Sequence, residues 1–198
     1  QGLSLHAQYR YADGRDFFCW QDVERTAQSA ESLMAGEGAA FHRFVRDAEN
    51  VYAAAGAPFL EAPYENMAGF LSRVLALGPA RILTGLKLST LDALAKRHFR
   101  SEALQQFVGR FATYAGASPW QANAAFAMIA HIERAFGVHH VEGGMGALVR
   151  ALATAVTRQG VAVQLGARVT WQQQSDGRFS VMREGAASTA EVFDSLVV

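Results

Sequence analysis

Several features that define common protein classes are scarce in this sequence of 198 residues. Cys19 is the only cysteine, which excludes an internal disulfide, and a reducing, cytoplasmic setting is expected. Acidic and basic residues balance at 18 each, so the chain lacks the basic excess with which nucleic-acid-binding proteins neutralise phosphates. Apolar runs are too short for a membrane-spanning helix, which needs about 20 residues.

What is present is apolar: hydrophobic residues make up 51% of the chain and charged residues 18%. Both ends have the alternating or apolar pattern of strands, over Leu3–Tyr11 and over Val192–Val198. Natural termini tend to lie in polar, poorly ordered segments. We therefore expect the chain to be an internal fragment of a longer polypeptide.

The hydrophobic pattern predicts a β-hairpin over 3–20, with its turn at Asp13-Gly14. Helical periodicity follows over 22–136, where Asp22 and Ser118 are candidate N-caps and one helix is expected to begin near Thr90. Pro119 would be the first residue of the helix that Ser118 caps. The first half of the chain is therefore predicted to be a helical region behind a hairpin.

The pattern changes after residue 137. A strand is predicted over 138–142, and Gly143-Gly144 then begins a helix that Gly160 ends. Further strands are expected at 161–165, 169–171, 179–182 and 192–198. The fold class is therefore α+β, a helical region flanked by β-strands.

Two glycine-rich segments can be compared with the Gly-x-Gly-x-x-Gly dinucleotide-binding motif. In Gly144-Met145-Gly146 the position that must be small is Val149, and in Gly36-Glu37-Gly38 it is Phe41. The motif needs a small residue there for close packing of helix on strand. Neither segment is therefore predicted to bind a pyrophosphate.

Metal-binding and acid–base chemistry find little support in the sequence. His139 and His140 are adjacent on a predicted strand, so they point to opposite faces and cannot ligate one ion from one side. His131 and Glu133 lack the spacing that places two ligands on one helical face. We expect no metal site, identify no catalytic residue, and interpret Cys19 as buried.

Aromatic residues are numerous in the helical region, and they allow two interpretations. Most should form the core, and some could line a cavity for a long apolar ligand. Spacing alone does not separate these interpretations.

One block is more distinctive: Phe107 to Trp120, with the sequence FVGRFATYAGASPW. Ala130–Glu133, Gly137-Val138 and Glu142–Met145 follow it in order, and Tyr9–Gly14 and Leu165–Val169 complete the pattern. This order resembles the phytoene desaturase family of FAD-dependent carotenoid desaturases, closest to its hydroxyneurosporene (methoxyneurosporene) desaturase branch. The resemblance covers nearly the whole chain.

The resemblance implies hydride transfer from a polyene C–C bond to FAD in a complete enzyme. It assigns 1–142 to a substrate-binding region and 143–198 to a partial segment of a flavin-binding α/β domain. It implies cofactor contacts at Gly143, Gly144 and Val169. Substrate contacts are expected at Met145, Ala147, Tyr114, Trp120 and Phe126. The family's N-terminal Gly-x-Gly-x-x-Gly unit is absent, so this fragment should hold FAD weakly and be inactive alone.

Two other functions stay open at this point: a fragment of a flavin amine-oxidase-like oxidoreductase, and a non-catalytic module that binds an apolar ligand. The expected partners are a long apolar carotenoid-like substrate, the rest of the polypeptide, and a second copy paired through exposed strand edges. A helix with Met67, Phe70, Leu71, Val74 and Leu75 on one face could contact the cytoplasmic membrane peripherally.

Overall fold

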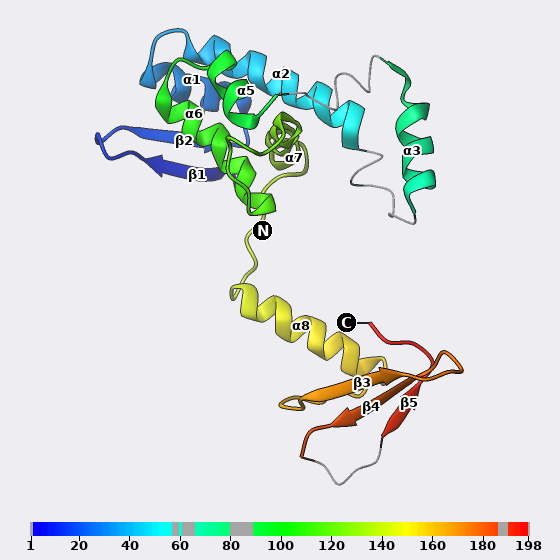
Figure 1. Ribbon diagram of the computed structural model, residues 1–198. Helices are drawn as coiled ribbons and strands as arrows, with labels where there is room; N and C mark the ends of the chain where they lie inside the picture. Colours follow the sequence, from blue (N-terminus) through cyan, green and yellow to red (C-terminus); the bar gives the residue numbers. More distant parts are fainter. Residues whose placement is uncertain (1, 57–59, 61–65, 80–88, 186–189, 198) are drawn as a thin grey trace. The chain divides into compact units, whose positions relative to one another are not determined.

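The computed structural model describes residues 2–56, 60, 66–79, 89–185 and 190–197 (Figure 1). The chain divides into two compact units, Gln1–His140 and Val141–Val198. Helices and strands both occur, as the α+β prediction states. None of the described helices is long and apolar enough to cross a membrane.

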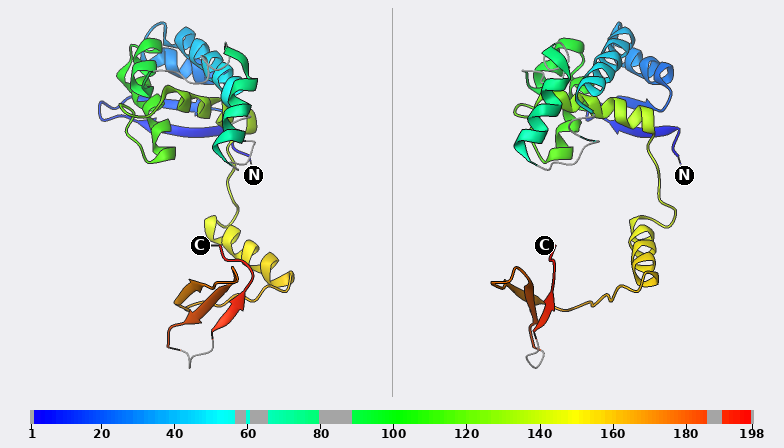
Figure 2. Two further views of the ribbon diagram at one scale, coloured as in Figure 1. Left: turned by 45° about the vertical axis from the view of Figure 1, so that its right-hand side comes forward. Right: turned by 90° about the vertical axis from the view of Figure 1, so that its right-hand side faces the viewer.

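Unit 1 begins with the predicted hairpin, formed by β1 (Leu5–Arg10) and β2 (Asp16–Trp20) in antiparallel register. The turn closes through the Gly14 N–H, which donates to the Tyr11 carbonyl, and Gly14 has a φ of +83° that favours glycine. Phe17 and Cys19 are buried from one face of β2. The hairpin lies along the helices of unit 1 (Figure 2).

Two antiparallel-packed helices follow, α1 (Val23–Leu33) and α2 (Glu37–Gly56). The Asp22 carboxylate accepts the Arg25 N–H, which confirms the predicted N-cap. Gly38 lies in the first turn of α2. A Cβ there would come within 2.9 Å of the Ala27 carbonyl oxygen, so glycine permits α2 to approach α1.

The rest of unit 1 is built from short helices: α3 (Met67–Ala76), α5 (Leu91–His98), α6 (Glu102–Gly109), η2 (Arg110–Ala115), η3 (Ala124–Ala127) and α7 (Met128–Phe136). Their buried aromatic residues pack with the hairpin into one core. Its large members are Phe17, Phe41, Phe44, Phe99, Phe107 and Phe111. The core interpretation is therefore confirmed for these six of the described aromatic residues, whereas Tyr114 and Trp120 are exposed.

Two sequence predictions in unit 1 are wrong. No helix begins at Pro119; the segment from Ser118 is a turn whose carbonyls at Pro119 and Ala122 accept the N–H groups of Asp92 and Leu91. These carbonyls satisfy backbone donors that the first turn of α5 leaves free. The strand predicted over 138–142 is an isolated bridge between Gly2 and His139.

Unit 2 contains α8 (Met145–Arg158) and a sheet in the order β3 (Val169–Gln173), β4 (Phe179–Arg183), β5 (Glu191–Phe193), all antiparallel. The alternating segment 161–165 is irregular and exposed rather than a strand, and β5 is shorter than the predicted 192–198. Every residue of α8 is at least partly exposed to solvent.

Candidate functional site

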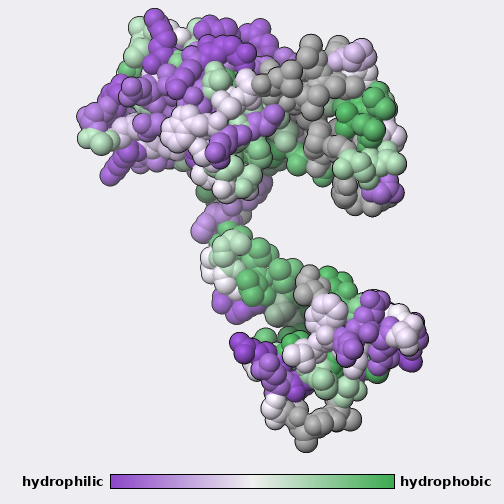
Figure 3. Space-filling model, viewed as in Figure 1, coloured by the Kyte–Doolittle hydropathy of each residue, from purple (hydrophilic) through white to green (hydrophobic). Residues whose placement is uncertain are grey.

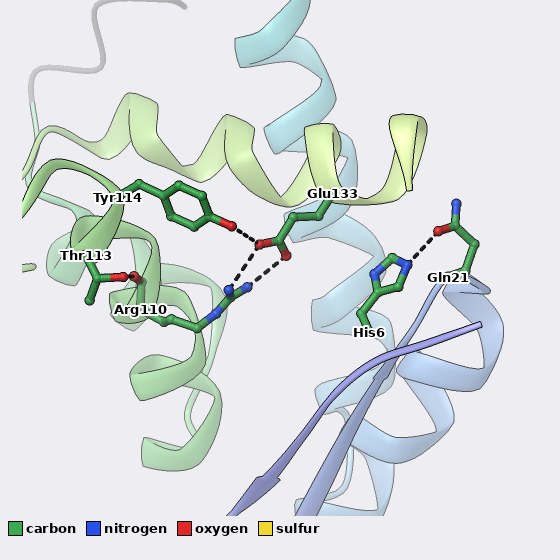
Figure 4. A network of polar contacts seen from close by, with 6 residues as sticks. All are labelled: His6, Gln21, Arg110, Thr113, Tyr114 and Glu133. Carbon is green, nitrogen blue, oxygen red and sulfur yellow. Dashed lines mark hydrogen bonds and ion pairs between the residues drawn. The ribbon is translucent and has the colours of Figure 1, made fainter. Parts of the chain in front are cut away.

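The block that carries the family resemblance is held by one ion pair. Arg110 at the start of η2 donates through both terminal nitrogens to the carboxylate of Glu133 on α7, at 3.0 and 2.8 Å (Figure 4). The Tyr114 hydroxyl donates to the same carboxylate at 2.8 Å. The side chains of Arg110 and Glu133 are 30% and 14% exposed. This network joins η2 to α7 through side chains that are largely buried.

Arg110 and Tyr114 both keep their protons at neutral pH. Burial by itself would lower the pKa of Arg110, but the hydrogen bonds and charge of Glu133 outweigh it and raise that pKa. Burial, followed by the hydrogen bond to Glu133, raises the pKa of Tyr114. Arg110 stays charged and Tyr114 stays neutral, so these two groups position segments rather than exchange protons.

An enclosed cavity of about 20 Å³ lies beside Glu133. Cys19 contributes to its mostly apolar wall, and burial raises the pKa of that thiol to about 12. His6 lies in the same wall, where its Nε2 is 2.6 Å from the Gln21 amide oxygen (Figure 4). The cavity holds about one water molecule and no larger ligand. Cys19 is buried, as the sequence interpretation held, and is not a nucleophile.

The histidines that were considered as metal ligands are dispersed. His139 forms a backbone β-bridge with Gly2. The His131 ring lies against the Tyr52 ring, with the two ring centroids 4.8 Å apart. Within the described ranges, no group of three or more His, Cys, Asp or Glu side chains is arranged to hold a metal ion.

The predicted cofactor contacts lie in unit 2. Gly143 and Gly144 have φ angles of +78° and +75°, and the Gly144 N–H donates to the Val141 carbonyl. Met145 begins α8 and is 65% exposed. Ala147 lies next to the turn: a Cβ atom added at Gly143 would lie 3.2 Å from the Cβ atom of Ala147. Val169 is the first residue of β3 and is half exposed.

The three aromatic residues predicted to contact substrate are all in unit 1. Tyr114 is exposed but fixed by its bond to Glu133. Phe126 is partly buried and packs against the core. Trp120 is 68% exposed and lines a groove whose exposed surface is mostly apolar.

Sequence reasoning quoted Arg110 and Glu133 within the family pattern and did not pair them. They are 23 residues apart, and no local rule joins residues at that separation. The neighbouring residues did indicate that each charge needs a partner, because Arg110 is followed by the apolar Phe111 and Glu133 is preceded by the apolar Ile132. A charge among buried neighbours usually needs a partner.

Comparisons with known proteins agree with the resemblance seen in the sequence. The chain is 32% identical to a hydroxyneurosporene desaturase of Rubrivivax gelatinosus, over 89% of this chain and 33% of that protein. It is 33% identical to one of Cereibacter sphaeroides, over 88% of this chain and 37% of that protein. A 4,4'-diapolycopene oxygenase of Methylomonas is 26% identical, over 90% of this chain and 35% of that protein.

No family model matches the sequence. The chain spans about a third of the length of the curated relatives that it matches. These relatives confirm the resemblance on which the sequence analysis relied: over nearly nine tenths of its length, the chain is similar to the carotenoid desaturases of the phytoene desaturase family.

Proposed function

We propose that this chain is the substrate-binding part of a flavin-dependent carotenoid desaturase, with one segment that returns to the flavin domain. The similarity to two hydroxyneurosporene desaturases over nearly nine tenths of the chain carries this proposal. When bound, FAD supplies the acceptor for the hydride removed from a polyene C–C bond. The chain's own contribution is to bind the polyene, orient it and exclude water.

The backbone at the proposed cofactor contacts fits a flat aromatic ligand. Among the described atoms, none lies within 4 Å of the Cβ that a side chain at Gly144 would add, so a ring can approach the backbone there. In the described part of the chain, β3 pairs with β4 on one side only. The other edge leaves backbone groups near Val169 for an adenine. Gly143, Gly144 and Val169 are therefore the proposed flavin contacts.

The proposed substrate contacts follow from the same arrangement. Met145 and Ala147 lie at the turn where the flavin ring is proposed, and Met145 presents an exposed, flexible apolar side chain. In unit 1, Tyr114 and Phe126 are the proposed polyene contacts. Ring positions fixed by a hydrogen bond or by core packing suit a long, rigid ligand.

A chimera tests the proposal. Residues 1–198 would replace the corresponding segment of the Rubrivivax protein, and the polyene product would be followed by its absorption. We expect product from the chimera and little from its Gly144→Ala variant, because a methyl group would meet the flavin. Gly160→Ala is the matched control, because Gly160 has a similar φ of +79° and equally open surroundings at the other end of α8.

Two outcomes would contradict the proposal. A chimera that folds and binds FAD but forms no product would contradict the substrate-binding role. Equal loss of activity in Gly144→Ala and Gly160→Ala would show backbone strain rather than a cofactor contact. The isolated chain is expected to be inactive and to lack the flavin band at roughly 450 nm.

A second function is favoured by the similarity to a 4,4'-diapolycopene oxygenase over 90% of the chain. Mass spectrometry of the chimera's product separates the two, because desaturation removes two hydrogen atoms and oxygenation adds oxygen. Oxidation of an amine instead would support the amine-oxidase-like alternative. Polyene binding without turnover would support the non-catalytic module.

Peripheral membrane contact is proposed for α3. Met67, Leu71 and Leu75 recur every four residues and are 65%, 52% and 62% exposed, so they form one apolar stripe (Figure 3). Val74 is half-buried, and the Phe70 side chain lies outside the described residues. Liposome flotation tests this: Leu71→Ser should reduce flotation, whereas Ser72→Ala on the same helix should not.

Unit 2 exposes apolar surface that we propose the rest of the polypeptide covers. The α8 stripe of Leu148, Leu152 and Val156 is 39%, 58% and 39% exposed, and Trp171 and Phe193 on the sheet are 49% and 43% exposed. The alternative is a second copy of the chain paired through strand edges. Light scattering decides: a concentration-dependent dimer of the isolated chain supports the second copy.

A further inference from the structure

A groove of about 370 Å³ lies on unit 1 and has a volume typical of small-molecule sites; neither Arg110 nor Glu133 lines it. Its apolar wall consists of Trp120, Pro119 and Gly109. Trp120 is 68% exposed. Most of the indole surface is therefore open to a ligand in this groove.

The indole is carried on a backbone that is already rigid. The Ala122 and Gln121 N–H groups donate to the Ser118 carbonyl, at 2.8 and 3.0 Å, and close the turn. The turn is tied to α5 through the Asp92 N–H, which donates to the Pro119 carbonyl at 3.0 Å. A ligand would therefore find the backbone that carries Trp120 already ordered, which lowers the entropy lost on binding.

The opposite wall is polar and carries one net negative formal charge, from Asp92, Glu102 and Lys96. Asp92 and Lys96 neutralise each other in an ion pair of 2.9 Å. Beside them lie Glu102, Gln105 and Gln106. The Gln105 amide nitrogen donates to the Phe99 carbonyl at 2.9 Å, which holds that side chain in place. The wall thus offers hydrogen-bond donors and acceptors together, with no large charge of one sign.

These two walls discriminate between ligand classes. A polyene chain would remove water from Glu102 and Gln106 without replacing the lost hydrogen bonds, which is unfavourable. A strongly charged ligand would meet a paired aspartate and lysine. A pyranose ring has an apolar C–H face for the indole and hydroxyl groups that both donate and accept.

We propose that this groove binds a pyranose sugar, with Trp120 against the apolar face of the ring. The Glu102 carboxylate accepts from sugar hydroxyls, and the Gln106 amide and Lys96 ammonium donate to them. The sugar is either a free saccharide or the glycosyl group of a lipid-like molecule, since the same ring chemistry serves both.

The test observes the tryptophans of the whole chain by NMR during titration with methyl glucoside, methyl galactoside and methyl mannoside. The indole N–H resonance of Trp120 should shift and saturate with a Kd of about 1–10 mM, as expected for a small ligand in an open groove. Trp171 is the internal control, because it is also exposed but lies on the sheet of unit 2. Octyl glucoside below its micelle concentration tests the second source: tighter binding than the methyl glycoside indicates a glycosylated lipid.

Variants sharpen the result. In Trp120→Ala, binding is followed at the side-chain amide resonances of Gln105 and Gln106 and should be weakened about tenfold or more, because an aromatic stacking contact is lost. Gln106→Ala should weaken it less, and Trp171→Ala should leave it unchanged. Failure of Trp120 to shift with all of these glycosides would overturn the proposal. So would equal shifts at Trp120 and Trp171, or a shift caused by tetramethylammonium and not by sugars, which would indicate a cation site.

Discussion

Removal of the Glu133 carboxylate should destabilise unit 1 markedly, because it leaves the Arg110 guanidinium without its ion-pair partner. Truncating one partner of a buried ion pair costs about 3–5 kcal/mol. The Arg110 side chain is 30% exposed, so water partly solvates the remaining charge, and we expect about 2–3 kcal/mol for Glu133→Ala. Glu133→Gln keeps an oxygen acceptor for Tyr114 and should cost about 1–2 kcal/mol.

Urea unfolding measured by Trp20 fluorescence reports on unit 1 alone if Trp120 and Trp171 are first replaced by phenylalanine. Trp20 is a suitable probe because the Arg25 guanidinium lies 3.6 Å from its ring centroid in the folded state. The double variant Arg110→Met, Glu133→Leu removes both charges. It should recover most of the lost stability, because an apolar pair can replace a buried ion pair at little cost.

This reasoning would be refuted if Glu133→Ala lowered the free energy of unfolding by only about 0.5 kcal/mol or less, the range of ordinary surface substitutions. Additive effects of the two single substitutions, with no coupling energy, would refute it as well. Either result would mean that solvent screens the pair as it does on a protein surface.

Three further predictions concern unit 1. Glu37 is 1% exposed, and its Oε1 accepts the N–H groups of Arg100 and Ser101 at 2.8 and 2.9 Å. Glu37→Ala should therefore lower the free energy of unfolding by about 2–4 kcal/mol. A loss no larger than that caused by Glu49→Ala, on the surface of α2, would contradict this prediction. Because burial raises the Cys19 pKa to about 12, iodoacetamide should alkylate it in urea but not in the native state at neutral pH, and rapid native alkylation would disprove its burial. Burial lowers the pKa of His98, and Asp47 opposes that shift, so the unfolded chain binds the proton at a higher pH than the folded chain does. The free energy of unfolding should therefore fall as the pH drops below about 6.5. His98→Gln should reduce this dependence on pH, and an unchanged dependence would show that other groups cause it.

Local signals in the sequence determined much of unit 1. Asp22 caps α1 and Thr90 caps α5, because an N-cap bond joins residues only three apart in the chain. The Asp13-Gly14 turn and the helical spacing of buried aromatic residues were likewise readable. The FVGRFATYAGASPW block, 107–120, carried the resemblance to carotenoid desaturases without any structure.

The tertiary structure decided what depends on distant partners. Ser118-Pro119 satisfies the local rule for a helix start, yet the carbonyls of Pro119 and Ala122 accept N–H groups from the first turn of α5, and the segment forms a turn instead of a new helix. The alternation at 161–165 is that of a strand, but a strand also needs a neighbour to accept its backbone hydrogen bonds, and the described part of unit 2 pairs β3, β4 and β5 with one another instead. The Arg110–Glu133 pair and the groove at Trp120 arise in the same way, because folding brings together residues whose separation follows no local period.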